Sequence, residues 1–230
     1  MIAAGLPILF DRDGLLAVAK PPGLPVHPTR DLQRPSVLGL LQRAYPTQHI
    51  GLVHRLDVDT TGVLLLTRAK ALQAELGRAF AERRVHKTYV ALCEGRLEAS
   101  LPLAIHNYLK PQKLSGIERM VAVRSGGEVA RSTVVAVRNG VQLCAVVVQP
   151  ETGRRHQIRA HLSGLGTPLC GDRLYGAKGR PPAPRVMLHA WHIELPHPQT
   201  GEKLLISCAI PDNFAQFARQ HDLPLADLWP

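Results

Sequence analysis

Residues 54–62 read HRLDVDTTG and lie between two aliphatic runs, IGLV at 50–53 and VLLLT at 63–67. The two runs predict buried structure on both sides of a segment that holds His54, Arg55, Asp57 and Asp59. Asp, Thr and Gly are ordinary turn formers, so a plain surface turn would explain part of this composition. The rest of the sequence decides whether the segment is a turn or a functional site.

The charge of the chain favours a polyanionic partner. Among 230 residues, 28 are Lys or Arg and 18 are Asp or Glu, which gives a formal net charge of +10. Most of the excess is arginine, whose planar guanidinium grips phosphate at two points, so nucleic acid is favoured over a membrane surface. Charge alone leaves open a basic protein whose charge only keeps it soluble. Aromatic residues are 4% of the chain, too few for a row of stacking side chains.

The cysteines and the N-terminal residues bear on the cellular compartment. Cys93, Cys144, Cys170 and Cys208 lie far apart and form no CxxC pair, which favours reduced thiols over a zinc site or a disulfide framework. The segment MIAAGLPILFDRDG reaches acidic residues too early for a signal peptide, and no apolar run approaches membrane length. We therefore expect a cytoplasmic protein without a membrane contact.

The hydrophobic patterns predict an α+β fold. PILF at 7–10 and LLAVAK at 15–20 flank the turn DRDG and predict a hairpin, which a stiff proline-rich loop, PPGLPVHPT, follows. Further strands are predicted at 63–67, 87–95, 130–150 (as a hairpin), 185–195 and 203–210, and helices at 36–45, 69–83, 153–166 and 212–220. Hairpin-joined strands with helices inserted between them indicate a largely antiparallel mixed sheet flanked by helices.

Local signals add detail to these elements. Weak periodicity from about Glu98 to Gly127 predicts long loops that could touch a large ligand. Asn139 and Gly140 predict a type I′ turn in the hairpin at 130–150. The helix at 153–166 should close at Gly164 or Gly166. Asp212 or Asn213 should cap the helix at 212–220.

Several common chemistries are not supported. His189 and His192 are three apart in a predicted strand, so their rings should point to opposite faces, and His156 and His161 are five apart on a predicted helix. The sequence contains no HExxH, GxGxxG, GxxxxGK[ST] or GxSxG motif. We therefore expect no metal, no nucleotide cofactor and no Ser/His/Asp hydrolase site.

The segment ETGRRHQIRAHLSGLGTPLCGDRLYG, residues 151–176, is unusually dense in polar side chains. On a helix, Arg155 and Arg159 are four apart and would share a face, which costs a few tenths of a kcal/mol unless an anion lies opposite. That anion could be phosphate or a carboxylate from elsewhere in the fold. A solvated basic helix face is the ordinary alternative.

Taken in order, these segments resemble the motifs of the RluA family of pseudouridine synthases. The matching stretches are AVAKPPGLPVHP, HRLDVDTTGVLLLT, HKTYVALCEG, ETGRRHQIRAHLSGLGTPLCGDRLYG and LHAWHIELPHPQTGE. They run from about Leu15 to Ala209. Thr61 stands where the family commonly has Ser, and the chain lacks the N-terminal S4-type RNA-binding domain of many relatives. The resemblance implies a single pseudouridine-synthase-like catalytic domain over residues 1–230, with a central active-site cleft.

The resemblance also implies a cofactor-free isomerase that converts a uridine of RNA to pseudouridine. Asp57 matches the family's catalytic aspartate and would be the nucleophile, since an anion can stabilise and trap a developing oxocarbenium ion. Arg159 matches the arginine that pairs with this aspartate, and Tyr89 matches the tyrosine beneath the target base, although a core aromatic is its ordinary interpretation. Arg55 matches the arginine that fills the space of the extruded uridine. Asp59 is expected to shape the turn.

Further residues are expected around this site. Lys20, Arg154 and His156 are expected to meet RNA phosphates, although a solvated surface role is open for each. His54, Thr61 and Leu188 are expected to line the substrate pocket. The expected partner is ribosomal or transfer RNA, and a stem-loop is the preferred target. The protein is expected to act as a monomer.

Two other functions compete with the isomerase. A non-catalytic RNA-binding or ribosome-assembly protein could keep the same fold, but a binder has no need for an aspartate among arginines that face phosphate. A glycosidase-like hydrolase could use Asp57 and Asp59, but these are separated by one residue and need not face each other at the required distance. The sequence leaves open which RNA and which uridine would be modified.

Overall fold

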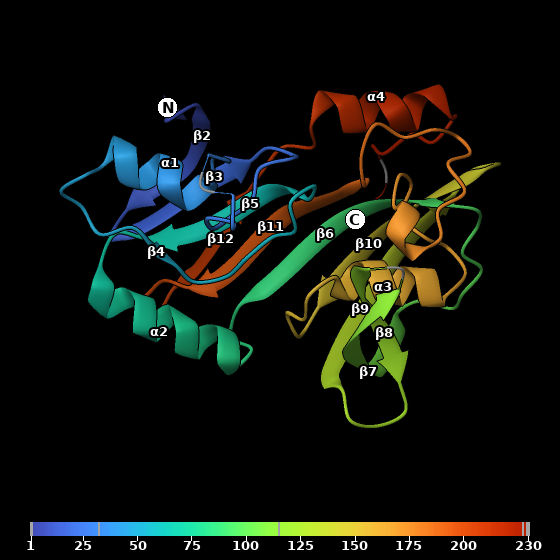
Figure 1. Cartoon of the computed structure of the whole chain (residues 1–230), viewed down its shortest axis with the longest axis horizontal. Coiled ribbons are helices and arrows are strands. Elements are labelled where there is room, and N and C mark those ends of the chain that lie inside the picture. The colour runs from blue at the N-terminus through green and yellow to red at the C-terminus, as the bar shows by residue number, and fades with distance from the viewer. Residues whose placement is uncertain (1, 32, 115, 227, 229–230) are drawn as a thin grey trace. The chain divides into compact units, whose positions relative to one another are not determined.

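The computed structural model describes residues 2–31, 33–114, 116–226 and 228. It divides into two compact units: unit 1 comprises Met1–Lys87 and Ala190–Ala209, and unit 2 comprises Thr88–His189 and Ile210–Pro230 (Figure 1). The chain passes between the units within β6 (His86–Glu94) and within β11 (Leu188–Pro196). That both units act as the one catalytic domain expected from the sequence stays a prediction.

Unit 1 is built around β5 (Thr61–Thr67), in which all seven residues are buried. Its other strands are β1 (Ile2–Ala3), β2 (Leu6–Arg12), β3 (Leu15–Lys20), β4 (Gly51–Leu52) and β12 (Lys203–Ser207). The pairings β1–β2, β2–β3, β3–β5, β4–β5 and β11–β12 are antiparallel. The hairpin predicted near the N-terminus is therefore confirmed.

Two helices complete unit 1, and both were predicted from the sequence. In α1 (Val37–Ala44) the side chain of Ser36 accepts a hydrogen bond from the Gly39 N–H at 3.1 Å, which satisfies an orphan donor of the first turn. The other helix, α2 (Lys70–Ala81), buries Leu76 and Ala79. These two residues join a core cluster with residues of β3, β5, β11 and β12.

Unit 2 holds β7 (Leu103–Leu114), β8 (Ile117–Val123), β9 (Glu128–Asn139) and β10 (Leu143–Pro150) in antiparallel order with β6. Three helical segments accompany the strands: α3 (Gln157–Gly164), the short 3-10 helix η1 (Arg173–Tyr175) and α4 (Asp212–Gln220). Ala160 of α3 packs on the cluster formed by Leu109, Met120 and Ala130. The predicted α+β class and its largely antiparallel sheet are confirmed in both units.

The prediction of long loops from about Glu98 to Gly127 is wrong for most of that range. Residues 103–114 and 117–123 form the paired strands β7 and β8, with Tyr108 opposite Val123. Exposed residues alternate with less exposed ones along the first half of β7, but many of the positions are His, Asn, Lys or Gln. This polar composition hid the period of two that identifies a strand.

Two predicted local features are also corrected. The hairpin between β9 and β10 exists, but neither Asn139 nor Gly140 has the positive φ that a type I′ turn requires. Instead, the Asn139 side chain accepts a hydrogen bond from the Leu97 N–H at 2.9 Å and donates to the Leu97 carbonyl at 3.0 Å. At α4, Pro211 occupies the cap position and Asp212 already lies within the helix.

The predicted end of α3 is confirmed at one of its two candidate glycines. Gly166 has φ +81°, and its N–H donates to the Ser163 carbonyl at 3.0 Å. The Thr167 N–H donates to the Leu162 carbonyl at 3.1 Å, which completes a Schellman motif. Among the described residues, no helix is both long and apolar enough to cross a membrane.

Candidate active site

The segment that carries Asp57 is a turn that two buried threonines follow in the chain. The Thr60 N–H donates to the Asp57 carbonyl at 3.1 Å, so residues 57–60 form one turn. Arg55 and Asp59 are exposed, whereas Thr60 and Thr61 are 2% and 3% exposed. The turn position predicted for Asp59 is confirmed. Thr61 is the first residue of β5, directly after the turn.

Lys20 ties this turn to the proline-rich loop at 21–29. Its ammonium donates to the carbonyls of Pro21 at 2.8 Å, Leu24 at 2.9 Å and Val58 at 2.7 Å. Lys20 is only 2% exposed. Three acceptors for the three donors of a buried ammonium form an internal anchor for the backbone next to Asp57. The phosphate contact predicted for Lys20 stays a prediction.

His54 connects the same segment to β5 and α2. Its Nε2 accepts a hydrogen bond from the Leu65 N–H at 2.9 Å, and its ring stacks on Phe80 with centroids 5.2 Å apart. Burial, and secondly the positive charge of Lys87, lowers the pKa of His54 to about 3. The imidazole is therefore neutral near pH 7, as an acceptor at Nε2 requires.

Gly62 shows how closely the end of this segment packs. It has φ +116°, and a Cβ at this position would lie 2.0 Å from the Ala190 carbonyl oxygen. A side chain there would require the backbone of β5 or β11 to move. The Gly of HRLDVDTTG is thus explained by a close approach of two backbones.

In unit 2, Arg159 forms a two-point ion pair with Asp172. Its Nε lies 2.7 Å from Oδ2 and its Nη2 lies 2.9 Å from Oδ1, with the two side chains 11% and 1% exposed. A carboxylate thus lies opposite Arg159, and it belongs to the same segment, 13 residues further along the chain. The predicted Arg155 and Arg159 helix face is wrong, because α3 begins only at Gln157 and Arg155 pairs with Glu118 instead.

The late start of α3 has a local cause. The Oε1 atom of Gln157 accepts hydrogen bonds from the Arg154 N–H at 3.0 Å and from the Thr152 hydroxyl at 2.6 Å. Its amide donates to the Arg131 carbonyl at 2.8 Å and to the Ser132 hydroxyl at 2.9 Å. These bonds hold residues 152–154 outside the helix. His156 then enters it with a left-handed φ of 52°.

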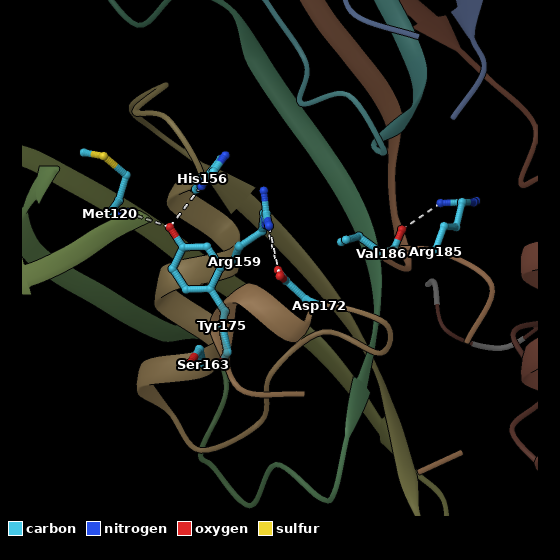
Figure 2. A network of polar contacts seen from close by, with 8 residues as sticks. All are labelled: Met120, His156, Arg159, Ser163, Asp172, Tyr175, Arg185 and Val186. Carbon is cyan, nitrogen blue, oxygen red and sulfur yellow. Dashed lines mark hydrogen bonds and ion pairs between the residues drawn. The ribbon is translucent and has the colours of Figure 1, made fainter. Parts of the chain in front are cut away.

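Tyr175 is the hub of the polar network in Figure 2. Its hydroxyl accepts a hydrogen bond from the Met120 N–H at 2.8 Å and lies 3.1 Å from His156 Nδ1. Its carbonyl accepts from the Ser163 hydroxyl at 2.7 Å. The Arg159 guanidinium lies over its ring, 5.0 Å from the centroid, within the range of a cation–π contact.

The remaining predicted residues have defined places in unit 2. Tyr89 is 8% exposed and lies opposite Val148 in the β6–β10 pairing. Leu188 is 4% exposed and begins β11. Arg154 forms an ion pair with Glu128 and donates from Nε to the Val129 carbonyl at 3.0 Å. The RNA contacts of Arg154 and His156 and the base contact of Tyr89 stay predictions.

The structure brings the predicted residues together in two groups. Unit 1 gathers Asp57 with Lys20, His54 and Thr61, and unit 2 gathers Arg159 with His156. The pairing of Asp57 with Arg159 stays a prediction. Among the described residues, no group of three or more His, Cys, Asp or Glu side chains could hold a metal ion.

Sequence reasoning assigned no role to three residues that the structure connects to these groups. Asp172 and Tyr175 belong to the quoted stretch GDRLYG, and Lys87 belongs to HKTYVALCEG. Burial lowers the pKa of Lys87 to about 8, so its ammonium is still mostly charged near pH 7. Asp172 could have been predicted as an ion-pair partner because it is a carboxylate close in sequence to the arginine-rich helix.

Comparison with known proteins gives this arrangement a family. The family model described as RNA pseudouridylate synthase matches residues 14–164, more than half of the chain. This chain belongs to the RNA pseudouridine synthase family. The members of this family are isomerases, and the resemblance read from the motifs is confirmed.

Two curated relatives and one solved structure indicate how far this synthase family likeness extends. The chain is 35% identical over 229 residues to ribosomal large subunit pseudouridine synthase D of Nitrosomonas europaea, covering 93% of this chain and 64% of that relative. It is 35% identical over 206 residues to the dual-specificity RNA pseudouridine synthase RluA of Escherichia coli strain K12, covering 86% and 90%. The structure of human RNA pseudouridylate synthase domain containing 4 matches with a TM-score of 0.75 at 27% identity, covering 95% of this chain and 94% of that one.

Proposed function

We propose that this chain is an RNA pseudouridine synthase that isomerises specific uridines in ribosomal or transfer RNA. Asp57 is the nucleophile, Arg159 is its ion partner, Tyr89 lies beneath the target base and Arg55 replaces the extruded uridine in the RNA stack. The reaction consumes no co-substrate, because it conserves every atom of the nucleotide, and we propose that it needs no cofactor. The two units act together as one catalytic domain with a cleft, and the protein works as a monomer.

The observation that carries the proposal is the anchoring of the Asp57 turn. The carbonyl of Val58, one residue after Asp57, accepts from the buried ammonium of Lys20 at 2.7 Å, and the Asp57 carbonyl accepts from Thr60 at 3.1 Å. His54 fixes the start of the same segment through its bond to Leu65 at 2.9 Å. A catalytic group needs such fixed placement, whereas an ordinary surface turn does not.

The chemistry follows from the groups assigned to the site. The bond between C1′ of the ribose and N1 of uracil breaks, and the Asp57 carboxylate stabilises the cationic character that develops at C1′ and then bonds to it. After the base rotates, C5 bonds to C1′ as the bond from Asp57 to C1′ breaks. The C5 proton then leaves, and N1 gains a proton. We assign Tyr89 as the group that accepts the C5 proton. Arg159, as the proposed ion partner of Asp57, orients its carboxylate towards C1′.

RNA as the substrate is supported by family membership and by the net charge of +10. The relatives' names include a ribosomal large subunit enzyme and a dual-specificity enzyme, so ribosomal and transfer RNA are both candidates. Extrusion of the uridine is least costly from a loop, where pairing is already absent. We therefore place the target in a stem-loop.

The experiment is a tritium-release assay with purified protein on total RNA labelled at C5 of uridine, read beside free uracil in the same reaction. An isomerase releases tritium to water without free uracil, whereas a glycosidase-like hydrolase releases uracil. An RNA-binding protein without activity shifts the RNA in a gel and releases neither. Pseudouridine mapping of RNA from cells with and without the gene then identifies the modified positions.

A further inference from the structure

We propose that Asp172 and Tyr175 are positioning residues that fix the guanidinium of Arg159, the residue proposed above as the ion partner of Asp57. The inference rests on the proposed function, because it assigns the supports of a residue in that site. Nothing in the sequence motifs alone distinguishes these two residues from ordinary scaffold.

The ion pair fixes the plane of the guanidinium. The Asp172 carboxylate accepts hydrogen bonds from Nε and Nη2 of Arg159 at 2.7 and 2.9 Å, and the Asp172 side chain is 1% exposed. A planar carboxylate bound at two points to a planar guanidinium defines both its position and its rotation. The edge used for this contact is the Nε–Nη2 edge. Nε and Nη2 are therefore held at fixed positions, and the planar guanidinium is held with them.

The backbone around Asp172 is itself held in place. Gly171 has φ +78°, and a Cβ there would lie 2.0 Å from the Arg185 carbonyl oxygen. The Asp172 N–H donates to Leu169 at 3.0 Å, and the Asp172 carbonyl accepts from Tyr175 and Ala177, both at 3.1 Å. The carboxylate thus starts from a backbone with little freedom to move.

Tyr175 supports the guanidinium from one face. Its ring centroid lies 5.0 Å from Cζ of Arg159, while its hydroxyl is held by Met120 and His156 and its carbonyl by Ser163 (Figure 2). The position of the ring is therefore fixed by contacts with β8, with the residue before α3 and with α3 itself. With Asp172 in the plane and Tyr175 on the face, Arg159 is restrained in two perpendicular directions.

The test compares turnover and RNA affinity in Asp172→Asn with those in Glu118→Gln. Asp172→Asn keeps the shape but loses the charge and one acceptor, so we expect kcat to fall about 10- to 100-fold with KM for RNA nearly unchanged, because a misplaced group costs rate rather than binding. Glu118→Gln removes the equivalent partner of Arg155, and its kcat should equal that of the wild type. Tyr175→Phe keeps the ring and loses the hydroxyl bonds, and its kcat should fall several-fold.

Wild-type kcat in a folded Asp172→Asn protein overturns the inference. If Asp172→Asn does not fold, Tyr175→Phe decides: wild-type kcat in that variant overturns the inference as well. Equal falls in Asp172→Asn and Glu118→Gln also overturn it, because they indicate a general effect of lost ion pairs. Failure of the proposed function looks different, since the wild-type protein then releases no tritium at all.

A second inference comes independently from the charge distribution of β7, β8 and β9. The strand registers place two sets of side chains on opposite faces of this three-stranded segment. The face that α3 covers contains Leu109 and Met120, and also both acidic residues of the three strands, Glu118 and Glu128. Both acids form ion pairs with the arginines that precede α3.

The opposite face, here called the open face, contains only cationic, neutral polar and apolar side chains. Its polar and aromatic members are His106, Tyr108, Lys110, Gln112, Arg119, Arg131 and Thr133. Tyr108 is 37% exposed, with its ring 6.1 Å from that of His106. Within the described residues, the buried Nε of Arg119 has no hydrogen-bond partner. The acids of the segment thus leave the cations of this face unneutralised.

We infer that the open face binds RNA, with phosphates at the cations and a base or sugar against Tyr108. The inference rests on the proposed function for the identity of the partner. Charge complementarity selects a polyanion. His106 and Lys110 are four residues apart on one strand, roughly 13 Å, so the cations can follow several successive phosphates rather than hold a single ion.

The test measures RNA affinity against salt for the triple variant Lys110→Ala/Arg119→Ala/Arg131→Ala. We expect affinity to fall at least about 10-fold and the slope of log K against log salt to decrease by about 2 to 3, since each lost phosphate contact accounts for roughly 0.9. The control is Arg43→Ala/Lys70→Ala/Arg78→Ala, which removes the same charge from exposed positions of unit 1. Unchanged RNA affinity in the first variant, or equal losses in both, overturns the inference.

Discussion

The ammonium of Lys20 donates to the carbonyl of Val58 at 2.7 Å across 38 positions of the sequence. This bond joins the end of β3 to the turn that carries Asp57. It is one of three bonds to backbone carbonyls made by a side chain that is 2% exposed. Lys20 is therefore best understood as the internal support of the turn, and its removal is the first prediction.

Lys20→Met should destabilise the protein strongly. The substitution keeps the length of the side chain but leaves three carbonyls without their charged donor, so we expect the free energy of unfolding to fall by about 3 kcal/mol or more. Urea unfolding measures this fall. Lys203→Met is the control, because Lys203 is 70% exposed and its ion pair with Glu194 lies at the surface, and it should cost less than about 1 kcal/mol. Equal costs for the two variants would refute the anchoring role.

Gly62→Ala should also destabilise the protein strongly, because there is no room for a side chain at this position. The added Cβ would lie 2.0 Å from the Ala190 carbonyl oxygen at a residue with φ +116°. We expect a loss of about 3 kcal/mol or more in thermal or urea unfolding. Gly77→Ala is the matched control: in α2 its Cβ would meet nothing within 4 Å, and it should stabilise by about 0.5 to 1 kcal/mol. A mild effect at Gly62 would contradict the close packing of β5 described above.

His54 should contribute to the acid sensitivity of the fold. Its pKa is lowered from 6.5 to about 3, so the folded state binds fewer protons than the unfolded state between these values. The stabilisation from neutral His54 is complete above about pH 6.5 and is lost as the pH falls towards 3, by at most about 1.4 kcal/mol for each pH unit.

The measurement compares wild type with His54→Asn, which does not titrate but can still accept from the Leu65 N–H. Urea unfolding at about pH 7.5 and about pH 5 should show the wild-type advantage shrinking in acid. His161, whose pKa burial lowers to about 4, titrates in the same way in both proteins and cancels in the difference. Parallel pH profiles for the two proteins would exclude this role of His54.

Much of the fold could be predicted because its strands and helices carry clear periods. The run VLLLT became the fully buried β5, and the helix predicted at 69–83 is α2, whose Leu76 lies in the core of unit 1. The β7–β8 hairpin was missed although its two strands are neighbours in sequence, because the polar residues on its exposed face hide the period of two that identifies a strand.

The candidate site was also predicted only in part. The motif segment identified the turn at 57–60, but no local signal could reveal that Lys20 supports it from inside, since a lysine beside prolines is usually exposed. The prediction that Arg155 and Arg159 share a helix face was wrong because the Gln157 side chain binds the backbone before it, so the helix begins only at Gln157. Asp172 was overlooked because ion pairing depends on three-dimensional position rather than on spacing.

The most direct test of the account is the turnover of Asp57→Asn beside Asp59→Asn in the tritium-release assay. We predict that Asp57→Asn forms no detectable pseudouridine while it folds and binds RNA like the wild type, because only a carboxylate at position 57 serves as the nucleophile. Asp59→Asn should retain substantial turnover with some loss of stability. Full activity in Asp57→Asn, or abolished activity in Asp59→Asn alone, would contradict the central claim.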